Sequence, residues 1–195
     1  MAIAAILLAA DELVIDGTPV ALLPWGDAST LIEYQIDELQ AAGVDAIEVV
    51  LGFNGETLIP LVARENVEPL VNPRWRDTAS SLRVGAAAVP RDTEYALIVR
   101  LEEPRPSHVC RALLEAHGGV GQITRPAFQD APGAPIVAGY DALAALRNGT
   151  GGGPYGMLAQ WPTVLHVPFD SDVVLLTIRS HEDYERALSA LAAAP

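Results

Sequence analysis

Apolar runs of strand length alternate with segments of helical periodicity along most of the chain, and this alternation constrains the fold more than any other feature. Three runs are almost continuously apolar, at residues 3–8, 46–51 and 95–101. Such runs are typical of parallel strands that are covered on both faces. The alternation therefore predicts an α/β fold, a three-layer α/β/α sandwich with a mainly parallel mixed sheet.

Helices are predicted between these runs. Residues Thr30 to Glu33 have the capping-box pattern, Ile32, Ile36 and Leu39 share one helical stripe, and Gly43 is a stop signal. Further helices are expected at residues 55–64, 80–89, 106–118, 141–147 and from residue 180 onward.

Beyond residue 120 the elements become shorter. Strands are predicted at residues 122–125, 134–138, 164–167 and 173–178. The section near residues 120–160 is expected to face a substrate, with a flexible glycine-rich break at residues 149–153. We find no internal repeat and no long linker, so residues 1–195 are expected to form a single domain.

Charge and cysteine content exclude several classes of protein. There are 12 Lys+Arg residues against 25 Asp+Glu, so the formal net charge is −13, which argues against a nucleic-acid partner. The lone Cys110 excludes a disulfide framework and a cysteine-based zinc site. The first ten residues lack a basic start and are too short to span a bilayer. We therefore expect a cytoplasmic protein with no membrane partner.

Short motifs in a fixed order run through nearly the whole chain. They are Leu8-Ala9-Ala10, Ala21-Leu22-Leu23-Pro24-Trp25, residues 41–45, Asn72-Pro73-x-Trp75, Ser80-Ser81-Leu82-Arg83, Gly133-x-Pro135 and Glu182-Asp183. In this order they resemble the MobA/MocA-like molybdenum-cofactor nucleotidyltransferases. The resemblance implies a Rossmann-like nucleotidyltransferase fold and transfer of a nucleotidyl group from CTP or GTP to molybdopterin.

The resemblance also assigns site residues by position. It implies nucleotide binding by Ala9, Ala10, Gly17, Ser80 and Ser81, Mg²⁺ binding by Glu102 and Glu103, and a substrate-facing place for Gly133 and Pro135. Alternatively, Ser80 and Ser81 are plain helix-start residues. The alternative for Glu102 and Glu103 is that they are solvated residues at the edge of a loop.

The phosphate-binding loop departs from the family pattern, Ala-Ala-Gly-x-Ser-x-Arg-Met-Gly-x-x-Lys. On residues 9–20 the first glycine is Asp11, the arginine is Ile15 and the lysine is Val20. The loop has a formal charge of −3 from Asp11, Glu12 and Asp16. Two unit charges ~5 Å apart at an effective dielectric of ~20 interact by about 3 kcal/mol, so a triphosphate would be repelled. A solvated acidic loop is expected here, with the alternative that Asp11, Glu12 and Asp16 together attract a cation.

The metal and substrate positions are replaced as well. The family's Asp-x-Pro is Glu102-Glu103-Pro104 here, and Glu102 could still coordinate Mg²⁺. The two aspartates of the closing motif fall on Thr177 and Arg179, and a histidine of the family falls on Ala134.

We therefore expect a catalytically degenerate protein without a cofactor. It would act as a binding or interaction subunit in molybdenum cofactor or molybdoenzyme maturation, with a protein partner or as a homo-oligomer. One alternative is an active nucleotidyltransferase with a rebuilt Mg²⁺ site at Glu102 and Glu103. Another is a binder of a neutral or cationic small molecule, since Ile15 and Val20 make the cleft more apolar.

Overall fold

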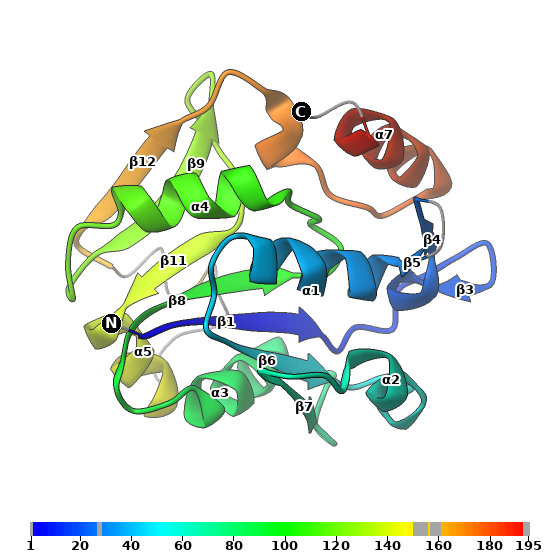
Figure 1. Ribbon diagram of the computed structural model, residues 1–195, viewed down its shortest axis with the longest axis horizontal. Coiled ribbons are helices and arrows are strands. Elements are labelled where there is room, and N and C mark those ends of the chain that lie inside the picture. The colour runs from blue at the N-terminus through cyan, green and yellow to red at the C-terminus, as the bar shows by residue number, and fades with distance from the viewer. Residues whose placement is uncertain (1, 27–28, 150–155, 157–160, 193–195) are drawn as a thin grey trace.

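The computed structural model describes residues 2–26, 29–149, 156 and 161–192, and one mixed sheet runs through it (Figure 1). Its strands are β1 (Ala2–Ala9), β6 (Ala46–Leu51), β7 (Val67–Val71), β8 (Thr93–Arg100), β9 (Ile123–Phe128), β10 (Ala131–Pro132), β11 (Ile136–Gly139) and β12 (Val164–Pro168). Strands β7, β6, β1 and β8 are neighbours in that order and are all parallel. Strand β11 joins antiparallel to β8 and β9, and β12 runs parallel to β9.

Helices cover both faces of the sheet, which confirms the predicted α/β class (Figure 1). One face carries α1 (Leu31–Ala41), α2 (Gly55–Val62) and α4 (Ser107–Ala116), and the other carries α3 (Thr78–Ala88) and α5 (Tyr140–Arg147). The last helix, α7 (His181–Ala192), lies beside the segment that precedes α1, where the Tyr184 hydroxyl donates to the Pro24 carbonyl. Within the described ranges, no helix has the length and apolar character needed to span a membrane.

Strand β1 shows why its sequence is apolar without interruption. Ala5 and Leu7 pack into the core on the α1 face, whereas Ala4 and Ile6 pack into the core on the α3 face. Helix α3 approaches this strand so closely that a Cβ built on Gly85 would lie 2.4 Å from Cγ2 of Ile6. A strand buried on both faces needs apolar residues at every position.

Local signals place the ends of α1. The backbone N–H of Thr30 donates to Oε2 of Glu33 at 3.0 Å, and the Thr30 hydroxyl donates to the same oxygen at 2.7 Å. These bonds confirm the capping box, and Gly43 follows the helix with φ +91°.

One prediction about a short segment is wrong, and one strand was missed. Residues 173–178, predicted as a strand, contain instead the 3₁₀ helix η2 (Asp172–Leu175), where the Ser171 hydroxyl accepts from the Val173 N–H at 3.3 Å. The apolar run arises because Val174 and Ile178 are fully buried, and a buried turn cannot be told from a strand by hydrophobicity.

The sequence pattern does not predict strand β7, because this strand lies at the sheet edge and contains Pro69. Apart from Gly149, the predicted break at 149–153 lies outside the described residues.

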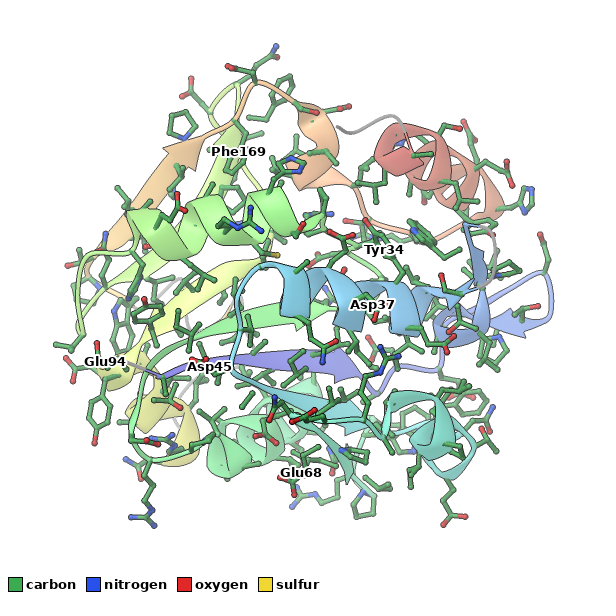
Figure 2. All side chains as sticks on the ribbon, in the orientation of Figure 1. Tyr34, Asp37, Asp45, Glu68, Glu94 and Phe169 are labelled. Atoms are coloured by element: carbon green, nitrogen blue, oxygen red, sulfur yellow. The ribbon has the colours of Figure 1, made fainter. Side chains whose placement is uncertain are left out.

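Glu48 is a buried acidic residue within the sheet. It is 3% exposed, it lies opposite Glu68 of β7, and its Oε2 has no hydrogen-bond partner among the described residues. Figure 2 labels Glu68 on the side of the sheet where α3 lies. Burial, followed by the charge of Glu68, raises the pKa of Glu48 to about 7.

The raised pKa of Glu48 makes stability depend on pH. From about pH 4.5 to 7 the unfolded state loses this proton before the folded state does, so the free energy of unfolding falls as pH rises. We expect Glu48→Gln to remove this pH dependence. The free energy of unfolding of the variant, relative to that of the wild type, should therefore rise by about 3 kcal/mol from pH 4.5 to pH 8. Urea unfolding at both pH values measures it. Glu56→Gln, at an exposed position, is the control, and a Glu48→Gln curve parallel to wild type would contradict the prediction.

Candidate functional site

The candidate site lies where the carboxyl ends of β1, β6, β7 and β8 meet, since ligands of parallel α/β sheets gather at that edge. Ala9 is the last residue of β1 and Ala10 follows it, while Glu102 and Glu103 follow β8, so the structure brings these predicted residues to one edge. The Phe53 N–H, after β6, donates to the Ala10 carbonyl at 3.1 Å.

The loop after β1 folds as a hairpin. Strands β2 (Val14–Ile15) and β3 (Thr18–Pro19) pair antiparallel and are joined by Asp16 (φ 49°) and Gly17 (φ 82°). Asp-Gly is a preferred two-residue hairpin turn because both positions need positive φ. Gly17, assigned to nucleotide binding, is therefore an exposed turn residue at the tip of the hairpin.

The hairpin turns Ile15 into the core, and Val20, which follows the hairpin directly, is buried there as well. Ile15 and Val20 are each 5% exposed and belong to the core on the α1 face. The Val20 N–H donates to the Leu13 carbonyl at 2.9 Å. The positions that hold the phosphate-binding arginine and lysine in the family pattern thus point inward.

Little space remains between the hairpin and the ends of β1 and β8. The cavity there has a volume of about 10 Å³, and its walls include Ala9, Asp11, Val20, Phe53 and Glu102. A volume of about one water-sized sphere holds a single water at most.

The acidic residues of the loop are exposed, as predicted, but each has a basic partner. Asp11 lies 3.7 Å from Arg100, and Glu12 lies 3.6 Å from Arg76. Asp16 Oδ2 lies 2.7 Å from Nδ1 of His181. These partners come from distant segments, so the sequence pattern of the loop alone could not reveal them.

Arg100, the last residue of β8, is the central cation of this edge. Its guanidinium pairs with Glu102 and with Asp11, and its Nη1 lies 3.9 Å from Glu103. Glu102 and Glu103 are each 6% exposed, so the alternative of a solvated loop edge is wrong. Burial raises the pKa of Glu102 to about 7, although Arg100 acts to lower it.

These carboxylates do not fit a Mg²⁺ site of the family type. Magnesium requires about six oxygen ligands in octahedral geometry, whereas Glu102 and Asp11 face a guanidinium. Thr177 and Arg179 occupy the closing positions. Across the described ranges, no group of three or more His, Cys, Asp or Glu side chains comes together in a way that could hold a metal ion.

Ser80 and Ser81 are buried near the start of α3 and bond to Asn72. The Asn72 amide donates to the Ser81 hydroxyl at 3.0 Å and to the Ser80 hydroxyl at 3.3 Å. Asp77, rather than either serine, caps the helix, because its Oδ1 accepts from the Ala79 N–H at 3.0 Å. These bonds hold the segment after β7 against α3.

A second cavity, of about 190 Å³, lies on the other side of Glu103. Gly133, predicted to face a substrate, lines it, and a Cβ at this position would lie 2.3 Å from the Val174 carbonyl oxygen. Pro135, given the same prediction, is buried beside it and follows a cis peptide bond from Ala134.

Buried Arg105 holds this cavity together, and the sequence motifs did not single it out. The side chain donates to the carbonyls of Ala134 (2.7 Å), Val174 (2.8 Å) and Leu176 (2.9 Å). Its backbone N–H donates to Oε1 of Gln35 at 2.8 Å, and the Gln35 amide donates back to the Arg105 carbonyl at 3.1 Å. The sequence signal that could have identified Arg105 is a charged residue between Pro104 and Pro106, shortly after a buried strand.

Comparison with known proteins agrees with this fold. The family model described as the MobA-like NTP transferase domain matches residues 5–164. The structure is similar to Rv0371c from Mycobacterium tuberculosis, with 24% identity, a TM-score of 0.81 and coverage of 96% of this chain and 98% of that one. Rv0371c has also been solved as a complex with manganese.

Two further structures share the fold. A nucleotidyl transferase from Methanothermobacter thermautotroptrophicus (Mth528) has 20% identity and a TM-score of 0.83, with 98% of each chain covered. The 4-diphosphocytidyl-2C-methyl-D-erythritol synthase from Anaerococcus prevotii has 14% identity and a TM-score of 0.71, with 98% of this chain and 96% of that one covered. No curated protein matches the sequence.

The ion pairs of Arg100 predict a pH-dependent loss of stability. Arg100→Met leaves the buried Glu102 without its cation, so we expect the free energy of unfolding to fall by about 3 kcal/mol at pH 8. The loss should be smaller at pH 5, where the Glu102 carboxyl is protonated because its pKa is raised further. Urea unfolding at both pH values tests this, with Arg100→Lys as the charge-preserving control. Equal losses at the two pH values would show that packing, and not charge, matters.

Proposed function

Because the chain belongs to the family of MobA-like NTP transferase domains, we propose that it is a catalytically degenerate member that serves as a binding or interaction subunit. The MobA/MocA-like enzymes that its motifs resemble act on molybdopterin. The proposed setting is therefore molybdenum cofactor or molybdoenzyme maturation.

The closed space under the hairpin is the observation that carries this proposal. Sites for small molecules and cofactors have volumes of roughly 300–1,000 Å³. The cavity under the loop that the resemblance assigns to phosphate binding measures about 10 Å³. A nucleoside triphosphate would have to displace the hairpin, and with it Ile15 and Val20 from the core.

The charges at this edge support the same proposal. Four carboxylates, from Asp11, Glu12, Glu102 and Glu103, face the two guanidinium groups of Arg76 and Arg100, which leaves a formal charge of −2. Both arginines are engaged by these carboxylates. A triphosphate with about four negative charges would compete with the carboxylates for the same cations.

Nucleotide titration distinguishes this proposal from an active enzyme with a rebuilt metal site. We expect calorimetric titration with CTP, GTP and ATP, each with Mg²⁺ or Mn²⁺, to show no saturable binding below about 1 mM, a dissociation constant that corresponds to about 4 kcal/mol. An active nucleotidyltransferase of the family serves as the positive control. Micromolar binding that Glu102→Ala abolishes and Glu56→Ala leaves intact would overturn the proposal.

Substitution within β2 tests whether the hairpin is packed structure. We expect Ile15→Arg to lower the free energy of unfolding by about 3 kcal/mol, because it buries a charge in the core. Val14→Arg is the matched control, since Val14 is 42% exposed, and it should change stability by less than about 0.5 kcal/mol. Chemical denaturation measures both variants.

A triple substitution defines the result that would contradict a packed hairpin. If the triple variant Asp11→Gly, Ile15→Arg, Val20→Lys folds with wild-type stability and binds CTP, the loop has only lost its ligand-binding residues. The space under the hairpin would then be able to open for a nucleotide. The small volume of the cavity would not explain the absence of nucleotide binding in the wild type.

A further inference from the structure

The cavity beyond Glu103 has the opposite charge to the closed one. All 12 basic residues of the chain are arginine, and three of them line this cavity: Arg105, Arg125 and Arg179. Against the single carboxylate of Glu103 they leave a formal charge of +2, in a chain whose net charge is −13. Oε1 of Glu103 also lies 3.9 Å from Nη1 of Arg100, so a further arginine offsets the charge of this carboxylate.

The walls of this cavity are held in place by two of the arginines. Arg105 is 1% exposed and ties Ala134 to Val174, so it joins the segment before β11 to η2. Nε and Nη2 of Arg125 donate to the Gly133 carbonyl at 3.1 and 2.7 Å. The site is thus built from two segments that these side chains fix.

Arg179 lies at the exposed side of the cavity. Its backbone N–H donates to Oδ2 of Asp183 at 3.1 Å, which anchors the residue at the start of α7. Within the described part of the chain, its guanidinium makes no hydrogen bond or ion pair. A guanidinium presents planar donors that match the oxygens of phosphate and carboxylate groups.

We propose that this cavity binds a small molecule through a phosphate or carboxylate group, with Arg179 contacting the oxyanion and Arg105 and Arg125 supplying fixed positive charge. A concave site lined by one sign of charge concentrates ligands of the opposite sign. The volume of about 190 Å³ accepts an oxyanion and a few attached atoms. The proposal gives a ligand class to the proposed binding role and rests on that role.

Titration with inorganic phosphate tests the site, in metal-free buffer at constant ionic strength, with succinate as the carboxylate probe. We expect saturable binding of at least one probe to the full chain. Arg179→Gln should weaken that binding about tenfold, the effect of losing one charge-assisted contact. Arg186→Gln is the matched control, because this exposed arginine belongs to α7, pairs with Asp183 at 3.7 Å and does not line the cavity.

Each outcome has one meaning. Binding lost in Arg179→Gln and kept in Arg186→Gln supports the site, and the probe that binds more tightly identifies the preferred group. Absence of saturable binding of both probes, or equal weakening by both substitutions, overturns it. Micromolar CTP binding that depends on Glu102 would instead overturn only the proposed loss of nucleotide binding, so the two failures are distinguishable.

Discussion

The buried guanidinium of Arg105 is the contact on which the carboxyl edge of the sheet depends. It donates to three carbonyl oxygens of the segments before β11 and around η2, while its backbone is hydrogen-bonded to the side chain of Gln35 in α1. Removing a buried charge from such a network leaves several carbonyls without donors, each at a cost of about 1–3 kcal/mol. The same contacts explain why residues 173–178 form a turn: Val174 and Leu176 offer their carbonyls to Arg105 instead of to a strand.

The two cavities beside Glu102 and Glu103 differ in both space and charge. The one under the hairpin holds about 10 Å³ and is surrounded by excess carboxylate, whereas the other holds about 190 Å³ and is lined by excess arginine. A nucleotidyltransferase needs cations where the triphosphate lies. Here three arginines line the other cavity, which agrees with the proposed binding role without nucleotidyl transfer.

Elements defined by neighbouring residues could be predicted from the sequence, and those defined by distant pairs could not. The capping box of α1 and the double-sided burial of β1 depend on local spacing and composition. Asp16-Gly17 is an equally local signal for a hairpin turn, but the resemblance assigns Gly17 to nucleotide binding instead. The pairing of Arg100 with Asp11 and Glu102 joins segments that meet only in the folded sheet, so the burial of the two glutamates could not be anticipated.

The absence of the family pattern's Arg and Lys and the inward packing of this loop have one physical basis. Ile15 and Val20 stand where the family pattern has Arg and Lys, and an open loop would expose both to water. Burying such side chains stabilises the fold by about 1.5–3 kcal/mol each, so the loop gains by folding inward as a hairpin. Once the hairpin is closed, its acidic residues lie at the surface, where Arg76 and Arg100 pair with Glu12 and Asp11. Restoring the cations alone would therefore oppose the packing of the loop before it created a phosphate site.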